Sequence, residues 1–294
     1  MYKEQYNEYL IDIGQADSTI EQHLKNLDYY LDWCDEMGIE EHEFVSRGTI
    51  LEYTKHMQSI PVGVGTQNIR INGLRHYYQC LLFNRIIAKN PVGTFTVRGA
   101  KKTVVKDALS EEELLELYQQ YVYFRDSQPR KNISEEMKII TDLRYKVVMS
   151  FIIFQGMHGG DMDRLLRSDI NLENGVITIV AGRRTNERNL PLHQSQIILL
   201  YRYLELLPSS QEKLFVGTAH NIVTKVINEL KGLNSRIGNL SQIRSSVIIQ
   251  WTSMFGKRKA QYMTGHKWVS STEIYQKQDT KELTALIEAH HLFA

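Results

Sequence analysis

Apolar residues recur every three or four positions through most of the first part of the chain, a spacing that places them on one face of an α-helix. The stripe is clearest between Ile20 and Cys34, and Gly38 follows it. Similar stripes run over residues 47–57 and 66–87, and the second of these ends at Asn90-Pro91, because the residue before a proline disfavours the helical conformation. The pattern therefore predicts a helical domain over residues 1–93.

The period changes in the second half of the chain. Ser110 and the three glutamates after it predict the start of one helix, and a second helix is expected from Ser134 to about Gly156. Residues 175–180 then alternate between apolar and polar, residues 182–186 are typical of a turn, and residues 188–192 are extended, so a β-hairpin is predicted. Helical spacing resumes after it. The fold class expected is mainly α with a small β-sheet, an α+β fold.

A short basic segment separates the two halves. The chain has 294 residues, which is more than one hydrophobic core of ordinary size usually organises. Residues 94–107 contain Gly99 and four basic side chains and show no apolar periodicity. We expect them to form a linker between the helical domain and a second domain over residues 108–294.

The near-neutral total charge of +1 conceals an uneven distribution. Residues 1–52 contain three basic and thirteen acidic side chains, whereas residues 53–106 contain nine basic ones and no Asp or Glu. The acidic segment could neutralise the basic one, or the basic one could face the phosphates of a nucleic acid. We favour the second interpretation, because the basic residues gather on one segment and continue into the linker. The candidate DNA contacts there are Arg70, Arg75, Lys101, Lys102 and Lys106.

Composition excludes several other classes of protein. The longest apolar stretch, Val147 to Phe154 interrupted by Ser150, is too short to span a membrane. Cys34 and Cys80 form no CxxC motif, so we expect no disulfide, no metal site and a reducing cytoplasm as the compartment.

Four motifs follow one another in the second domain. They are QGMHGGDMDRL at 155–165, GRRTNERNLPL at 182–192, LSQIRS at 240–245 and TGHKWVSSTEIY at 264–275. The last has a Gly-His pair with a tyrosine nine residues after the histidine. In this order the motifs resemble those of the tyrosine recombinase, or phage integrase, family. The N-terminal segment is similar to that family's helical core-binding domain, so the resemblance extends over nearly the whole chain.

The resemblance implies site-specific recombination of double-stranded DNA through a 3′-phosphotyrosyl intermediate, by a homotetramer. Tyr275 would be the nucleophile, and Arg244 and His266 would stabilise charge on the phosphate. A phenolic oxygen can hold the phosphate as an ester, so the chemistry itself needs no cofactor and no metal. The segment after the nucleophile, residues 280–293, could dock on a neighbouring protomer or on its own domain.

The chain departs from the family's motifs at three positions. His158 stands where the pattern has its first arginine, Arg183 where it has a lysine, and Ser241 where it has a histidine. A guanidinium is a poor proton donor, so general acid catalysis would pass to water or to His266. These changes leave open a catalytically degenerate DNA-binding or regulatory protein of the same fold. A topoisomerase that uses the same tyrosine is a third interpretation.

Further basic residues accompany the motifs. Arg183 and Arg184 could contact DNA or simply face solvent at a hairpin tip. The basic residues around the start of the last motif could likewise form a solvated surface. We favour contact with DNA phosphates, because the neighbouring motif is the one that resembles a DNA-cutting site. The candidate DNA contacts of this second group are Arg184, Lys257, Arg258, Lys259 and Lys267.

Overall fold

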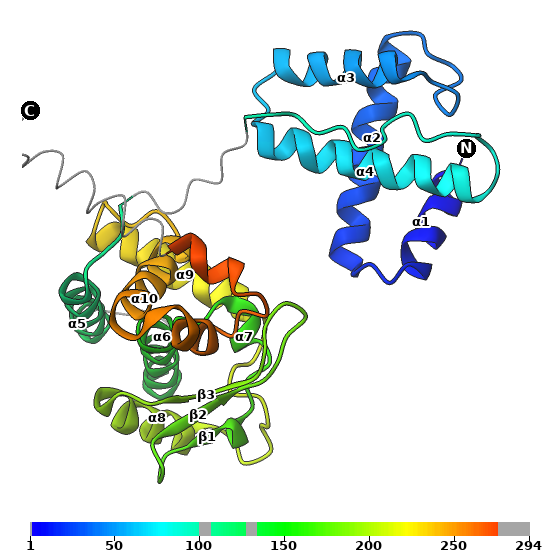
Figure 1. Cartoon of the computed structure of the whole chain (residues 1–294). Helices are drawn as coiled ribbons and strands as arrows, with labels where there is room; N and C mark the ends of the chain where they lie inside the picture. Colours follow the sequence, from blue (N-terminus) through cyan, green and yellow to red (C-terminus); the bar gives the residue numbers. More distant parts are fainter. Residues whose placement is uncertain (1, 100–106, 128–133, 276–294) are drawn as a thin grey trace, which may run out of the picture. The chain divides into compact units, whose positions relative to one another are not determined.

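The computed structural model describes residues 2–99, 107–127 and 134–275. The chain divides into two compact units, residues 1–102 and 103–294 (Figure 1). Each unit has its own hydrophobic core. The boundary falls within the segment expected to be a linker. The candidate contacts Lys101, Lys102 and Lys106 and the segment 280–293 lie outside the described residues.

The N-terminal unit is helical. Its elements are α1 (Lys3–Asp12), α2 (Asp17–Glu36), α3 (Arg47–Ser59) and α4 (Val64–Phe83). Aromatic side chains fill the space between α2 and α4, and the hydroxyl groups of Tyr30 and Tyr78 lie 2.8 Å apart in this core. The helical periodicity of the sequence is explained by this packing, because the apolar stripes of the helices face one another.

The chain after α4 folds back onto this unit. Val92 is buried in the core, and Phe95 and Val97 pack against it. The Arg75 guanidinium donates to the carbonyl oxygens of Gly93 and Phe95, each at 2.6 Å. The first residues of the expected linker therefore belong to the helical unit, because the side chains of Phe95 and Val97 pack against its core.

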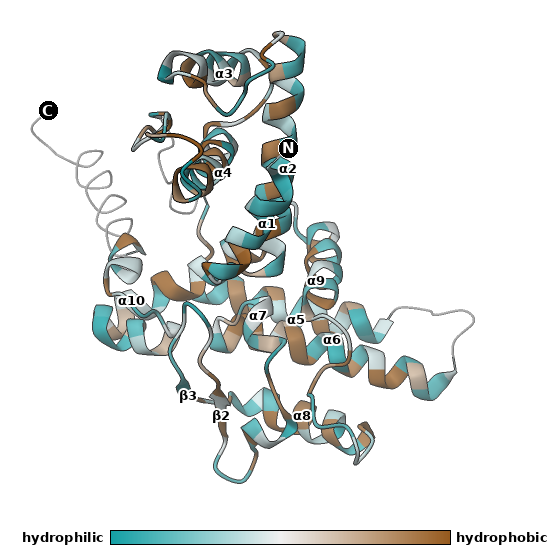
Figure 2. Cartoon of the chain, turned by 90° about the vertical axis from the view of Figure 1, so that its right-hand side faces the viewer, coloured by the Kyte–Doolittle hydropathy of each residue, from teal (hydrophilic) through white to brown (hydrophobic). Residues whose placement is uncertain are grey.

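The C-terminal unit surrounds the long helix α6 (Glu135–Gln155). Four of the described helices pack against α6: α5 (Glu111–Ser127), α8 (Gln194–Leu206), α9 (Ala219–Leu233) and α10 (Leu240–Thr264). Figure 2 shows apolar and hydrophilic residues interspersed along these helices, as amphipathic packing requires. The other described elements are α7 (Gly159–Met162), the 3-10 helix η1 (Arg167–Asp169), β1 (Ile170–Asn171), β2 (Val176–Ile179) and β3 (Arg188–Pro191).

The β-strands form one antiparallel sheet in the order β1-β2-β3. The predicted hairpin is confirmed as β2 and β3, with Ile177 opposite Leu190, and β1 adds an edge strand that the sequence pattern did not predict. The mainly helical fold class with a small sheet is confirmed.

Local signals in the sequence account for where the helices of this unit begin and end. Ser110 and Glu113 exchange side-chain hydrogen bonds with each other's backbone N–H groups, a capping box. Ser134 caps α6, which ends at Gly156 in the left-handed conformation with φ 54°. Helix α10 bends at Gly256, where φ is 74°. Within the described ranges no helix is long and apolar enough to cross a membrane.

Candidate active site

The first turns of α10 carry Arg244 to the end of α6. Its Nη1 atom donates to the carbonyl oxygen of Gly156, and its Nη2 atom donates to that of Thr264 at 3.2 Å. The side chain is 12% exposed. Burial lowers the pKa of Arg244, and nearby Arg188 acts in the same direction, while Asp161 and Tyr275 raise it. Arg244 is thus a fixed, largely desolvated donor whose charge interacts with the Tyr275 hydroxyl.

His266 and Tyr275 lie side by side after α10. Gly265 ends the helix with φ 72°, and a further helical turn carries Tyr275 back over the histidine ring. The two rings are stacked with centroids 6.2 Å apart and planes 16° from parallel. The Nδ1 atom of His266 lies 2.9 Å from the hydroxyl oxygen of the buried Thr272. The spacing of nine residues thereby brings the histidine and the tyrosine of the last motif into one site.

Burial and the neighbouring arginines change the charge of His266. Burial lowers its pKa to about 4, with Arg244 and Arg188 contributing in the same direction. The imidazole is therefore neutral at physiological pH. If the Thr272 hydroxyl donates to Nδ1, the Nε2–H group is left as a donor for a ligand. A neutral imidazole offers no positive charge, so His266 can orient an oxyanion without neutralising it.

The tip of the β2–β3 hairpin lies against this loop. Thr185 forms a backbone bridge with His266, and the Asn186 N–H group donates to the Gly265 carbonyl oxygen at 2.8 Å. The Lys267 ammonium donates to the Arg183 carbonyl oxygen at 2.9 Å. Two motifs separated by some eighty residues are thus joined into one surface, with Arg183 and Arg184 exposed at the tip.

A buried carboxylate, Asp161, holds the cations of the site together. Its Oδ2 atom accepts from Arg188 Nη2 at 2.9 Å, and its Oδ1 atom accepts from Arg164 Nη2 at 2.9 Å. Arg244 Nη1 lies 3.9 Å from Oδ2. Burial would raise the pKa of Asp161, but Arg188, His158 and Arg244 together lower it below its ordinary value. Asp161 is therefore an anion at the centre of three guanidinium groups.

Neither Asp161 nor Arg188 was among the residues that the motifs singled out. One signal for Arg188 exists: it has the same phase along β3 as the inward-facing Leu190, and a charged residue at such a position requires a buried counterion. The signal for Asp161 is its place three residues after His158, where a capping box has its acidic member.

His158 has a structural task of its own. It is the N-cap of α7, and its Nδ1 atom accepts from the Asp161 N–H group at 3.0 Å. Burial lowers the pKa of His158, and Arg244 and Arg164 act in the same direction against the opposing effect of Asp161. The residue therefore lies beside Asp161 as a neutral side chain.

The remaining predicted residues make no contact with Asp161 that the structure describes. Ser241 is exposed in the first turn of α10, and Lys257, Arg258 and Lys259 are exposed after its bend. Arg70 and Arg75 belong to the N-terminal unit, where the Arg70 guanidinium stacks over the Tyr29 ring at 4.0 Å. Among the described residues, no group of three or more His, Cys, Asp or Glu side chains could hold a metal ion.

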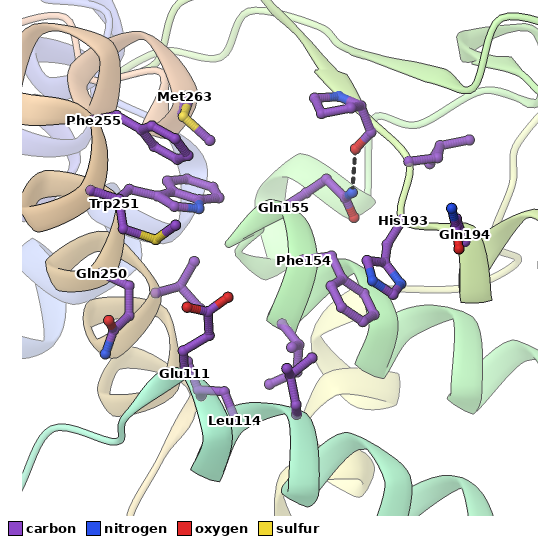
Figure 3. A pocket seen from close by; sticks show the side chains of 16 residues that line it. Glu111, Leu114, Phe154, Gln155, His193, Gln194, Gln250, Trp251, Phe255 and Met263 are labelled. Atoms are coloured by element: carbon purple, nitrogen blue, oxygen red, sulfur yellow. Dashed lines mark hydrogen bonds between the residues drawn. The ribbon is translucent and has the colours of Figure 1, made fainter.

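A cavity of about 640 Å³ opens elsewhere on the C-terminal unit, between α5, α6, α10 and the start of α8 (Figure 3). Phe154, Trp251, Phe255 and Met263 line it, and Gln155 bridges to the Pro191 carbonyl oxygen at 2.8 Å. Its walls are mostly apolar, so it lacks the converging cations that a phosphate requires.

Known proteins resemble this chain in sequence along most of its length. Tyrosine recombinase XerC 2 of Ralstonia nicotianae is 20% identical over 99% of this chain and 85% of its own length. Tyrosine recombinase XerD of Rhizobium meliloti is 23% identical over 96% of this chain and 91% of its own length. No protein-family model matches the chain.

Solved structures share the fold. The Tn1549 transposon integrase in complex with circular intermediate DNA is 13% identical, with a TM-score of 0.64 over 93% of this chain and 94% of that one. A lambda integrase dimer bound to a COC′ core site is 16% identical, with a TM-score of 0.63 over 92% and 95%. The predicted resemblance to tyrosine recombinases is thereby confirmed.

Proposed function

We propose that this chain is a site-specific tyrosine recombinase that cuts and rejoins double-stranded DNA. The observation that carries the proposal is the placement of Tyr275 against His266 and within the electrostatic field of Arg244. The named relatives are tyrosine recombinases, and two of the structures with this fold are integrases in complex with DNA. Assembly as a tetramer on DNA is part of the proposal.

The cutting step transfers one phosphodiester bond to the protein. The Tyr275 oxygen attacks the scissile phosphorus and loses its proton to water, the bond from phosphorus to the 5′ oxygen breaks, and that oxygen takes up a proton. The products are a 3′-phosphotyrosyl ester and a free 5′ hydroxyl, and the reverse step rejoins the strand. Arg244 and the neutral His266 donate to the non-bridging oxygens, on which charge develops.

The proton for the 5′ oxygen comes from a group other than Arg183, because a guanidinium does not release its proton near neutral pH. His266 is a neutral imidazole at that pH, since its pKa is about 4, so it cannot act as the general acid. Lys267 lies at the hairpin tip, where its ammonium already donates to the Arg183 carbonyl oxygen. We assign the role of general acid to Lys267.

The test is to trap the covalent intermediate. Wild type, Tyr275→Phe and Tyr201→Phe would be incubated with nicked and gapped genomic fragments, and protein–DNA adducts that survive denaturation would be counted. Tyr201 is exposed on α8 and has no part in the site, so it serves as the matched control. We expect adducts with wild type and Tyr201→Phe and none with Tyr275→Phe, and sequencing of the trapped ends then identifies the DNA site.

Two other outcomes would contradict the proposal. DNA binding without any adduct in wild type would favour the catalytically degenerate protein. Relaxation of supercoiled DNA by a monomer, with no exchange of strands between two sites, would favour a topoisomerase.

A further inference from the structure

Arg164 is a third guanidinium at the site. It lies within the motif at 155–165, but the resemblance assigns it no role. It follows α7, and its Nη2 atom donates to Asp161 Oδ1 at 2.9 Å. Within the described residues this is the one hydrogen bond that the side chain makes, and its Nε atom is buried without a partner. Arg164 is therefore anchored at one end while most of its donors remain free.

The Arg164 guanidinium lies close to two glycines. A β-carbon built at Gly182 would lie 2.7 Å from Arg164 Nη2 and 2.9 Å from the Thr185 hydroxyl oxygen. A β-carbon at Gly160 would lie 3.2 Å from His158 Cε1 and 3.6 Å from Arg164 Nη1. The guanidinium thus lies between His158 and the hairpin tip, and Thr185 at that tip bridges directly to His266.

Exposure distinguishes the three arginines around Asp161. Arg188 is fully buried, Arg244 is 12% exposed and Arg164 is 35% exposed. A phosphate approaching from solvent can touch Arg164, but it cannot touch Arg188. The two histidines add no positive charge at neutral pH, because the pKa of each is lowered. Arg164 is therefore the most accessible fixed cation of this cluster.

We propose that Arg164 binds a non-bridging oxygen of the scissile phosphate, as a second phosphate-binding guanidinium beside Arg244. The role rests on the proposed strand-cutting reaction and adds a phosphate-binding residue to it. Three guanidinium groups around one carboxylate leave a net charge of +2, and removal of Arg164 would halve it. The side chain thereby supplies the charge that the neutral His158 lacks.

The first experiment compares two DNA substrates built on the site recovered from wild-type adducts. One has the ordinary scissile phosphate, and the other has a neutral methylphosphonate, in which a methyl group replaces one non-bridging oxygen. We expect Arg164→Ala and Arg164→Gln to slow single-turnover adduct formation on the phosphate by about 100-fold to 1000-fold. On the methylphosphonate the loss should shrink to about tenfold or less, because one charge no longer needs a partner.

Matched variants separate this role from a structural one. Asp161 keeps Arg188 when Arg164 is replaced, and the amide introduced by Arg164→Gln can still donate to the carboxylate, so this variant should fold with an unchanged thermal midpoint. Arg202→Ala, on the exposed face of α8, should react like wild type. Equal losses on both substrates, or no loss on the phosphate, would overturn the role of Arg164.

A second experiment tests whether Arg164 supplies the positive charge that the neutral His158 lacks. The substitution His158→Arg should accelerate adduct formation much more in the Arg164→Gln background than in wild type, because only the former lacks a second accessible cation. The same gain in both backgrounds would count against the proposal. A wild type that forms no adduct would overturn the recombinase function itself, whereas a reactive wild type with unaffected Arg164 variants would overturn this inference alone.

Discussion

The Arg188 Nη2 atom lies 2.9 Å from Asp161 Oδ2, and both side chains are fully shielded from solvent. Within the described residues, Nε and Nη1 of Arg188 have no hydrogen-bond partner. The ion pair joins β3 to the short helix α7, so a single buried carboxylate connects the hairpin to the loop that carries His158.

Asp161→Asn should destabilise the C-terminal unit by about 3–5 kcal/mol, because it leaves the buried Arg188 charge uncompensated. Urea denaturation of the full chain would measure the free energy of unfolding. Glu173→Gln, in the exposed turn between β1 and β2, is the matched control and should change it little. Equal stability of the two variants would show that Asp161 is not the required counterion.

The ion pair of Asp161 and Arg188 also predicts how the free energy of unfolding depends on pH. The pKa of Asp161 is lower in the folded chain than in the unfolded one, where it is about 3.9. Its contribution is complete above that value and is lost as the pH falls through the folded pKa. Wild type should therefore lose more stability than Asp161→Asn in this acid range, as denaturation curves at a series of pH values would reveal.

Gly265→Ala should disrupt the site. The residue has φ 72°, and a β-carbon there would lie 2.6 Å from Arg188 Nη1 and 3.0 Å from the Asn186 carbonyl oxygen. The left-handed conformation alone costs an alanine about 1–2 kcal/mol, and the clash would displace the hairpin from His266. We expect loss of adduct formation and a lower thermal midpoint.

Gly232→Ala provides the contrast for that prediction. Gly232 lies in α9 with nothing within 4 Å of an added β-carbon, so alanine should raise stability by up to about 1 kcal/mol. If both glycine variants behaved alike, the close approach of Arg188 to Gly265 would not be the cause.

His266 should titrate far below an ordinary histidine. Its pKa of about 4 compares with about 6.5 in an unfolded chain, so its contribution to stability is present above 6.5 and is lost as the pH falls toward 4. An NMR titration of the ring, assigned with His266→Gln, would measure the value. A midpoint near 6.5 would contradict the burial of the ring among cations.

Lys267→Ala should slow cleavage of ordinary DNA by about 100-fold to 10,000-fold, the range expected for loss of a general acid. A substrate with sulfur in place of the 5′ bridging oxygen should restore the rate, because a thiolate leaves without a proton. The control Lys231→Ala, exposed on α9, should match wild type on both substrates. An equal deficit on the two substrates would assign Lys267 to DNA binding.

Local sequence signals were sufficient for most elements of the fold, but not for the edge strand β1. The caps at Ser110 and Ser134 and the αL glycine at Gly156 act through hydrogen bonds and torsion angles of adjacent residues, so they are readable without the tertiary structure. Residues 94–99 were harder to interpret, because Phe95 and Val97 show no periodicity and are fixed only by the core that they reach.

For the site, the residue types, the nine-residue spacing of His266 and Tyr275, and the departures at His158, Arg183 and Ser241 can all be read along the chain. That Asp161, Arg164 and Arg188 join them, and that the histidines are neutral, follows from the packing of distant segments. The physical reason is that charge and pKa depend on burial and on neighbours from other elements. Such contacts between α7, β3 and α10 leave no short-range pattern along the chain.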